Sequence, residues 1–378
     1  MHILTISEVY PSKDKPQYGV FIKQQIDELK KIGHCIDILM PIRSNKNGEI
    51  IETFWDDTKI YTVEYRVNRY ELFLMQTAKA VYLQLKELIK RNQYDILAVH
   101  ITGDAILNII IDIGKKLGIA VVAHYHGLNV WKEYNNKHRL RESFYACRRS
   151  KILKYAQAIV GVSDKVCEIV REKISNIPVY TVYNGVETEL FYPQKEKNDV
   201  FTIVGVGNLI SIKGFRYLID AFAQIYENDK NVCLKIIGEG VERGELEEKV
   251  KTLGLTGVVT FLGKLPYEQV SEQMRTSNLF VLPSYYEALG CVYLEAMACG
   301  IPTIGVKGMG IDEIIVDGEN GLLIEAQSVS SICEKIQSVI SNEDFAKKLG
   351  ENGRKTALQY TWKASATELD KVYRSILK

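Results

Sequence analysis

Two glutamates in the second half of the chain, Glu287 and Glu295, have the residue type and spacing for chemistry on a polar ligand. The strand-like run 279–282 leads toward them. The stretch 288–298 is rich in good helix formers, and Gly300 favours a helix end soon after it. We therefore expect a helix over 288–298, with Glu287 on the turn before it and Glu295 about two turns inside it.

The start of this expected helix is a candidate anion site. Its first residues, Ala288, Leu289 and Gly290, include two small side chains that leave the backbone accessible. The first N–H groups of a helix have no partner within the helix and lie at the positive end of its dipole, so they suit phosphate. Two acids beside a bound phosphate fit a ligand with a charged middle and hydroxylated ends. A sugar nucleotide has that shape.

A glycine-rich turn after another strand-like run is a second candidate phosphate site. It contains Gly207 and Asn208, and Lys213 follows at the expected start of a helix. As a dinucleotide fingerprint the turn is weak, because Ile210 stands at the third glycine position. Lys213 has two interpretations: a point charge for a phosphate, or an ordinary surface lysine.

The first half offers a histidine and a glycine as candidates. His126 precedes a glycine at the end of an expected strand, where it is either structural or a hydrogen-bond partner for a hydroxyl group. His124 lies two residues earlier, and we expect the two rings to point to opposite faces of the strand and not to form a metal pair. Gly19 either lets a ligand approach the backbone or simply begins a helix.

The elements that would position these residues alternate between strands and helices. Strand-like runs without polar alternation, separated by helical patterns, indicate parallel sheets covered on both faces. We expect strands at 2–7, 35–40, 96–99, 119–123, 158–162, 179–182, 200–206, 232–237, 258–262, 279–282 and 303–306, and helices at 20–32, 71–91, 106–117, 139–155, 165–173 and 363–377. Residues 43–64 are polar and predict an irregular excursion, with Pro41 ending the strand before it.

This alternation predicts an α/β fold with two Rossmann-like doubly wound domains facing each other across a cleft. A turn and linker pattern near 184–198 predicts the boundary between the two domains. The first domain is expected to span 1–186 together with about 362–378, and the second 187–361. In such sheets ligands bind beyond the carboxyl ends of the strands.

Composition narrows the class of protein. With 46% apolar and 25% charged residues, the 378-residue chain has the profile of a globular protein, and it has no run long enough to span a membrane. The N-terminus shows no signal-peptide pattern, and the seven scattered cysteines predict reduced, buried thiols in the cytoplasm. No feature indicates nucleic acid as a partner.

The net charge of +1 is divided unevenly, with +7 in residues 1–186 and −6 in the remainder. Basic residues gather between Lys137 and Lys154. This stretch is either a solvated helix face or a contact for an anionic membrane surface.

Together these motifs resemble the retaining GT-B glycosyltransferases of family 4, also called glycosyl transferases group 1. The most specific motif is E-x7-E, formed by Glu287 and Glu295. Supporting motifs lie in both halves: Gly207-x5-Lys213-Gly214, Gly238-Glu239-Gly240, Phe261-Leu262-Gly263, Asp317-Gly318-Glu319-Asn320-Gly321, His126-Gly127 and Asn184-Gly185-Val186. One position departs from the pattern, because Asn208 stands where the family often has arginine.

The resemblance implies a role for each candidate residue. Glu287 and His126 would be the catalytic residues that contact the donor sugar, and Glu295 would hold the ribose. The remaining donor-binding residues would be Lys213, Ala288, Leu289, Gly290, Asn208, Gly207, Gly19, Gly263 and Leu265. The first domain would bind the acceptor, the second would bind a UDP- or GDP-sugar, and the last helix would cross back to the first domain. No metal or other cofactor is expected, in agreement with the lack of an Asp-x-Asp motif.

The leading hypothesis is therefore a retaining transferase that moves a sugar to a lipid-linked or other glycan acceptor in bacterial surface polysaccharide biosynthesis. It would be cytoplasmic, or peripheral at the inner face of the membrane. Transfer to a small molecule or glycolipid is the alternative within the family. Two alternatives of another class are an NAD-dependent oxidoreductase and a non-catalytic nucleotide-sugar binding protein.

Overall fold

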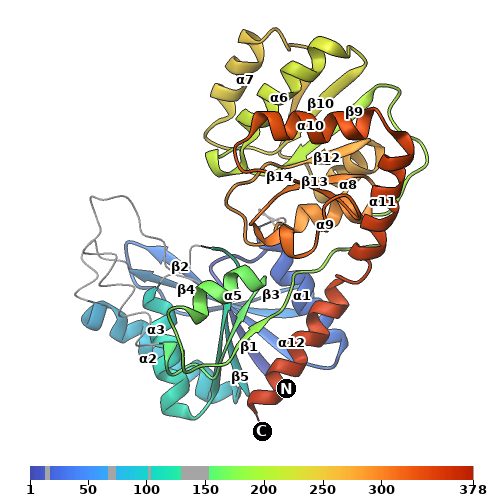
Figure 1. Cartoon of the computed structure of the whole chain (residues 1–378). Helices are drawn as coiled ribbons and strands as arrows, with labels where there is room; N and C mark the ends of the chain where they lie inside the picture. The colour runs from blue at the N-terminus through green and yellow to red at the C-terminus, as the bar shows by residue number, and fades with distance from the viewer. Residues whose placement is uncertain (13–17, 67–73, 101–103, 129–152, 378) are drawn as a thin grey trace. The chain divides into compact units, whose positions relative to one another are not determined.

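The computed structural model describes residues 1–12, 18–66, 74–100, 104–128 and 153–377. The chain divides into two compact units, Met1–Tyr183 with Ser365–Lys378, and Asn184–Ala364. Figure 1 shows the helices and strands of both. The two units are described separately below.

The first unit contains an eight-stranded sheet in the order β3-β4-β2-β1-β5-β6-β7-β8. All neighbouring strands are parallel except β3 and β4, which are antiparallel. The strands are β1 (His2–Ile6), β2 (Cys35–Ser44), β3 (Ile51–Trp55), β4 (Thr58–Arg66), β5 (Ile96–His100), β6 (Ala120–Tyr125), β7 (Ala158–Gly161) and β8 (Val179–Thr181). The helices between them are α1 (Val20–Lys31), α2 (Leu74–Asn92), α3 (Asp104–Leu117) and α5 (Asp164–Arg171).

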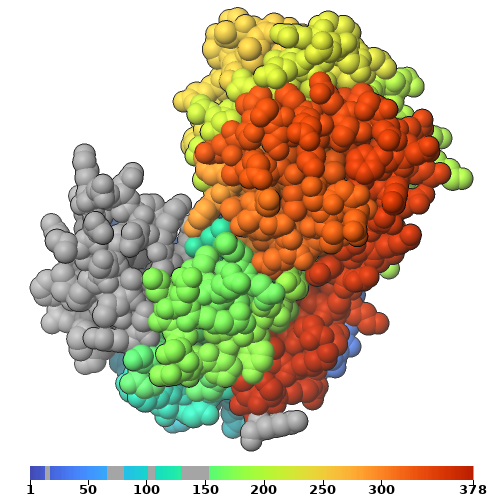
Figure 2. All heavy atoms as spheres, in the orientation of Figure 1, coloured from blue at the N-terminus to red at the C-terminus, as the bar shows by residue number. Residues whose placement is uncertain are grey.

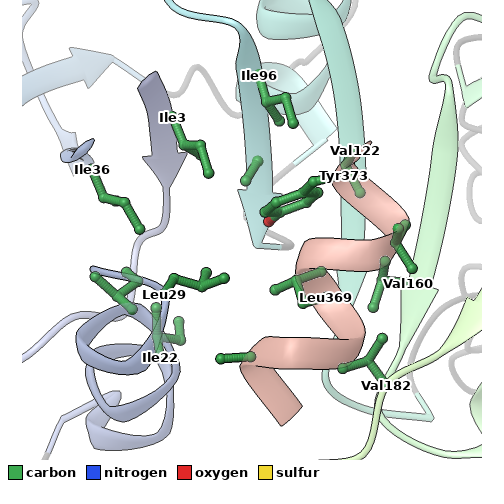
Figure 3. Packing of buried hydrophobic residues seen from close by; sticks show 14 of the residues in the cluster. Ile3, Ile22, Leu29, Ile36, Ile96, Val122, Val160, Val182, Leu369 and Tyr373 are labelled. Carbon is green, nitrogen blue, oxygen red and sulfur yellow. The ribbon is translucent and has the colours of Figure 1, made fainter. Parts of the chain in front are cut away.

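The last helix, α12 (Trp362–Ile376), completes the core of this first unit. Its inward face packs with α1 and with alternate residues of the sheet (Figure 3), and the buried cluster includes Ile3, Leu29, Val122, Leu369 and Tyr373. Its outward face forms the red strip on the surface of this unit in Figure 2. The predicted return of the C-terminal helix to the first domain is thus confirmed.

The prediction for residues 43–64 was wrong, because this stretch contains β3 and most of β4. β3 is an edge strand whose residues are mostly exposed, so it lacks the apolar signal of a buried strand. Pro41 does not end β2, which continues to Ser44. Pairing of β2 with β1 ends at Leu39, so Pro41 has a strand neighbour only on the β4 side, where a proline is tolerated.

The second unit contains a six-stranded, fully parallel sheet in the order β11-β10-β9-β12-β13-β14. Its strands are β9 (Phe201–Val206), β10 (Val232–Ile237), β11 (Val259–Gly263), β12 (Leu279–Val281), β13 (Thr303–Val306) and β14 (Leu322–Ile324). Its helices are η3 (Ser211–Lys213), α6 (Phe215–Asn228), α7 (Arg243–Thr252), α8 (Tyr267–Thr276), α9 (Cys291–Ala298), η4 (Gly310–Glu313), α10 (Val329–Ile340) and α11 (Glu343–Ala357). The predicted pair of doubly wound sheets is confirmed. In this second unit the sequence pattern missed the edge strand β14.

The structure also bears on the predicted burial of the cysteines and on the predicted lack of a membrane-spanning helix. Cys167, Cys299 and Cys333 are buried as predicted, but Cys35 is exposed. Among the described residues, no helix is both long and apolar enough to cross a membrane. The basic stretch around Lys137 and most of the helix expected at 139–155 lie outside the described residues.

Candidate active site

The loop after β12 leads into α9, the helix that carries the second glutamate. The helix begins at Cys291, so its predicted start at Ala288 was wrong. Gly290 caps it in the left-handed region, with φ of 79°, and a Cβ there would lie 2.8 Å from the Tyr293 ring. Glu295 is therefore the fifth residue of the helix, and Ala288 and Leu289 belong to the loop before it.

The backbone of this loop is held in one orientation by Gly310 of η4. Gly310 donates its N–H to the Glu287 carbonyl at 3.2 Å, and a Cβ on Gly310 would lie only 1.6 Å from the Ala288 carbonyl oxygen. In a trans peptide the carbonyl and the following N–H point in opposite directions. The N–H groups of Ala288 and Leu289 are therefore directed away from Gly310.

These N–H groups are available to a ligand. Among the described residues, no carbonyl or side chain accepts a hydrogen bond from the backbone N–H of Ala288, Leu289 or Gly290. Ala288 and Leu289 are nonetheless buried residues. Unpaired N–H groups are uncommon in buried backbone, so this loop has the donor arrangement of an anion site.

An ion pair lies beside the loop. The ammonium of Lys213, in η3, donates to the Glu287 carboxylate, and both side chains are largely buried. η3 is held to the loop because the Ile212 carbonyl accepts from the backbone N–H of Tyr285 at 3.0 Å and from the Ser284 hydroxyl at 3.2 Å. Lys213 is therefore not a free surface lysine. The two predicted site residues from separate motifs are in direct contact.

Glu295 occupies a different environment from Glu287. Its side chain is buried, and burial raises the pKa of this carboxyl to about 7, although a hydrogen bond from the Tyr267 hydroxyl opposes the rise. The Tyr267 oxygen lies 2.8 Å from Oε1 of Glu295. Close to neutral pH this carboxyl can thus be present in either protonation state.

The glycine turn after β9 is fixed by the loop after β10. Gly207 and Leu209 donate their N–H groups to the carbonyls of Ile237 and Glu239, at 3.0 and 2.9 Å. A Cβ on Gly238 would lie 1.9 Å from the Gly207 carbonyl oxygen, so this approach requires glycine. The Asn208 side chain on this turn is exposed.

The predicted positions after β11 lie next to the same loop. Gly263 accepts a hydrogen bond from the Gly238 N–H at 2.8 Å and has a positive φ of 68°. Leu265 follows it and is partly buried. The loops after β9, β10, β11 and β12 all leave the carboxyl ends of parallel strands, which is the edge where such sheets bind ligands.

In the first unit, His126 belongs to a stack of three histidines. His100 contacts both His124 and His126, with ring centroids 4.3 and 5.0 Å away and nearly parallel planes. The predicted opposite orientation of His124 and His126 was wrong, because alternate residues of an extended chain share a face. His100 and His126 share a hydrogen bond of 2.8 Å between Nδ1 and Nε2, and His124 bonds the Tyr373 hydroxyl at 3.0 Å.

Burial keeps these rings neutral. Desolvation lowers the pKa of His126 to about 4, and desolvation together with the neighbouring ring lowers the pKa of His124 to about 3. The pKa of His100 is well below its ordinary value for the same reasons. Nδ1 of His126 is buried and has no hydrogen-bond partner in the described part of the chain.

The local backbone structure explains why a glycine occupies position 19. It caps α1 with φ of 78°, and a Cβ would lie 2.6 Å from the Val9 carbonyl oxygen. The interpretation as a helix-entry glycine is sufficient to explain this residue. Its predicted place near a diphosphate stays a prediction.

Three residues of these sites were missed by sequence reasoning. Tyr267 and His100 reach their partners from separate elements, and no spacing in the sequence links them. Gly310 had a usable signal, because Gly308 and Gly310 follow directly after a buried strand.

Comparison with known proteins identifies the family and the fold. Residues 186–356 match the family model of glycosyl transferases group 1, and residues 19–190 match the model of glycosyltransferase family 4. The fold is that of the GT-B glycosyltransferases. The chain belongs to glycosyltransferase family 4 and is a glycosyltransferase, which excludes the NAD-dependent oxidoreductase considered above.

Several curated proteins are similar in sequence. An uncharacterized glycosyltransferase of Methanocaldococcus jannaschii, MJ1178, is 34% identical over 58% of this chain and 59% of its own length. The N-acetyl-alpha-D-glucosaminyl L-malate synthase of Bacillus anthracis is 25% identical over 95% of this chain and 93% of its own. One subunit of the phosphatidylinositol N-acetylglucosaminyltransferase of Arabidopsis thaliana is 24% identical over 93% of this chain and 76% of its own.

Solved structures share the fold at low sequence identity. A sucrose-phosphate synthase of Thermosynechococcus elongatus has a TM-score of 0.79 and 22% identity, covering 99% of this chain and 98% of its own. The Anabaena protein HepE, in complex with UDP and glucose, has a TM-score of 0.76 and 18% identity, covering 99% of this chain and all of its own.

Proposed function

We propose that this protein is a retaining glycosyltransferase that takes a UDP- or GDP-sugar as donor and a glycan, linked to a lipid, as acceptor. The observation that carries the donor site is the loop 288–290, whose unpaired N–H groups follow Glu287 of an ion pair and precede the buried Glu295 in the chain. A diphosphate matches the N–H groups, and hydroxylated groups match the two acids.

The proposed contacts follow the order of groups in a nucleotide sugar. The N–H groups of 288–290 and the Lys213 ammonium bind the diphosphate, and Glu287 accepts from the hydroxyls of the sugar. Glu295 accepts from the ribose hydroxyls, and the base lies by Gly263 and Leu265. The complex of HepE with UDP and glucose supports a donor of this kind.

The proposed reaction keeps the configuration of the anomeric carbon. The bond between that carbon and the leaving phosphate oxygen breaks, and a bond to the acceptor oxygen forms on the same face. The departing phosphate oxygen takes the acceptor proton, so the step balances without another base. Lys213 and the backbone N–H groups stabilise the charge that grows on the leaving diphosphate. The step needs no metal in this proposal.

The first unit is proposed to bind the acceptor, and His126 the donor sugar. The neutral ring of His126 and its unpaired Nδ1 suit a sugar hydroxyl. The excess of basic residues in 1–186 supports a contact with an anionic membrane surface, as expected for an enzyme that is cytoplasmic and peripheral, acting in bacterial surface polysaccharide biosynthesis. Vesicle binding that does not depend on anionic lipid or on salt would argue against that contact.

The substitution Lys213→Ala tests the donor site. We expect it to reduce turnover at least 100-fold, because Asn208 supplies no charge in place of the usual arginine. The control Lys307→Ala removes an exposed lysine from the loop after β13 and should leave turnover unchanged. Because Lys213→Ala leaves Glu287 largely buried without its cation, the double variant Lys213→Ala/Glu287→Gln should regain in thermal melts the stability that the broken ion pair costs. UDP or GDP binding that stays weak in the double variant then reports the lost cation. Near wild-type turnover in Lys213→Ala would overturn the assignment.

The donor is identified by a thermal-shift screen with UDP, GDP, ADP and common sugar nucleotides. A ligand that binds only the folded state raises the melting temperature by mass action, so one panel reports both base and sugar. No shift with UDP- or GDP-sugars at millimolar concentration would contradict the proposal.

A second candidate differs in the acceptor. The N-acetyl-alpha-D-glucosaminyl L-malate synthase of Bacillus anthracis aligns with almost the whole of this chain. By its name, that enzyme attaches a sugar to a small molecule. Glycosylation of a small hydroxy acid is therefore the alternative. Transfer to a soluble acid in an assay without lipid would favour it.

A further inference from the structure

A second cluster of reactive side chains lies in the first unit, at the end of the sheet opposite to His126. His2, Cys35 and Asp37 place one nitrogen, one sulfur and one oxygen within 4.8 Å of one another. They come from the first residues of β1 and β2, whereas His126 follows the last residue of β6. The cluster is therefore separate from the proposed sugar site.

The pairing of β1 and β2 explains how the three side chains meet. His2 is the register partner of Cys35, and Leu4 is the partner of Asp37, in a parallel pair. Residues that are directly paired, or two apart on one strand, share a face of the sheet. The opposite face carries Ile3 and Ile36, which belong to the buried cluster of α1 and α12. No spacing along the sequence reveals this set, since its members are 33 and 35 residues apart in the chain.

The hydrogen bonds around His2 leave one ring nitrogen as a candidate ligand. Nδ1 lies 3.1 Å from the Asn92 carbonyl, which can only accept, so Nδ1 carries the proton. In the neutral ring Nε2 then has a free lone pair, and it lies 3.2 Å from Oδ2 of Asp37. Two acceptors that face each other need a positive charge between them. Either a second proton on the imidazole or a metal ion can supply it.

The neighbours of the cluster favour a metal ion. Asp37 accepts a hydrogen bond from the Tyr94 hydroxyl at 2.6 Å, and the Asn92 carbonyl orients the imidazole. Such outer contacts are typical of metal ligands, because they fix the tautomer and direct the lone pairs. The Asp95 carboxylate, 2.7 Å from the backbone nitrogen of His2, adds negative charge nearby. The neighbouring cation Lys59 interacts with Asp37 and also pairs with Glu52, at 3.8 Å, so its charge is divided between the two carboxylates.

We propose that His2, Cys35 and Asp37 form a binding site for a zinc-like divalent ion, with the fourth position open to solvent. Thiolate, imidazole and carboxylate together are a ligand set that Zn²⁺ prefers. In a tetrahedral zinc site the ligand atoms are roughly 3.3–3.7 Å apart, so closure needs a movement of about 1 Å. Cys35 is exposed and can make that movement by rotating its side chain. Binding exchanges the thiol proton for the metal.

The site has no part in the proposed transfer reaction. It joins the starts of two strands, so its expected effect is on the stability of the folded protein. The expectation of metal-independent transfer is unaffected.

Titration of the purified protein with Zn²⁺ and with Co²⁺ tests the proposal. We expect one saturable site per chain, with a thiolate-to-cobalt charge-transfer band in the near ultraviolet for the Co²⁺ form. Cys35→Ser should abolish the band and weaken Zn²⁺ binding at least tenfold. The substitution is at an exposed position, so the variant should fold. His2→Gln should weaken Zn²⁺ binding in the same way.

The matched control is Cys233→Ser in β10, which removes a partly exposed thiol from the second unit. It should keep both the band and the affinity. Absence of saturable binding to the wild-type protein would show that a proton alone bridges His2 and Asp37, and would overturn the proposal. A band that persists in Cys35→Ser would overturn it as well, because the thiolate would then come from another cysteine.

Discussion

Glu295 predicts a specific pH dependence of nucleotide binding. As a ribose ligand this carboxyl must be ionised to accept two hydroxyl hydrogen bonds, yet burial raises its pKa to about 7. About one protein molecule in ten is then competent at pH 6, and about nine in ten at pH 8. Because apparent affinity scales with the competent fraction, we expect nucleotide binding to weaken about tenfold from pH 8 to pH 6.

The same carboxyl makes an opposite prediction for stability. Its pKa is about 7 in the folded protein and near the ordinary value of 4.5 in the unfolded chain. Between pH 4.5 and 7 the folded protein therefore binds a proton that the unfolded chain has lost. The stabilisation that this proton provides is fully present below pH 4.5 and is lost as the pH rises through 7. The shift corresponds to about 3 kcal/mol. Glu295→Gln should recover most of it at pH 8 and melt at a higher temperature than the wild type.

Calorimetric titration with UDP and GDP, at pH 6, 7 and 8, measures the first effect, and thermal melts of the free protein measure the second. Glu295→Gln should bind the nucleotide weakly and without pH dependence. In the wild type the hydrogen bond from Tyr267 lowers the pKa of Glu295. Tyr267→Phe removes this bond, so the pKa should rise and the midpoint of the binding profile should move to higher pH. A flat profile in the wild type, together with Glu295→Gln of unchanged stability, would refute the reasoning.

Two further predictions concern the loop backbone and the histidine stack. Gly310→Ala should cost about 3 kcal/mol of stability and abolish nucleotide binding, since its Cβ would overlap the Ala288 carbonyl. Gly308→Ala meets no atom within 4 Å and should cost about 1 kcal/mol through its positive φ. Denaturant melts and calorimetry compare the two variants, and equal effects would contradict the role of Gly310 in holding the loop. The lowered pKa of His126, about 4, predicts a loss of about 3 kcal/mol of stability as pH falls from 6.5 to 4, because the unfolded chain takes up the proton first. The same melts of His126→Phe should show a smaller slope in that range, and an unchanged slope would rule out His126 as its source.

The sequence predicted secondary structure best where the strands are deeply buried. Apolar runs without polar alternation predicted most of the strands that lie inside the two sheets, because a strand buried on both faces has no polar alternation. β4 also lies inside its sheet and was missed, because polar residues are interspersed along it. The edge strand β3 was missed since its side chains face solvent. The start of α9 was misplaced because Ala288 and Leu289 are good helix formers, while the left-handed Gly290 breaks the helix pattern before Cys291.

Contacts between distant segments could not be predicted from spacing. Lys213 and Glu287 were each recognised as candidates, but their direct pairing depends on how η3 and the loop after β12 meet. The same holds for Tyr267 beside Glu295 and for His100 in contact with the other two histidines. Such pairs depend on sheet order and register, which the local pattern does not contain.

The position of α12 in the core of the first unit has a consequence for synthesis. The segment from Ser365 onward is made after the whole of the second unit, Asn184–Ala364, yet its residues Leu369 and Tyr373 belong to the same buried cluster as Ile3 of β1. The second unit is therefore complete in sequence before that segment emerges from the ribosome. The core of the first unit is therefore completed last, although the rest of that unit is made first. The first unit must wait, with part of its apolar core uncovered, until α12 has been made.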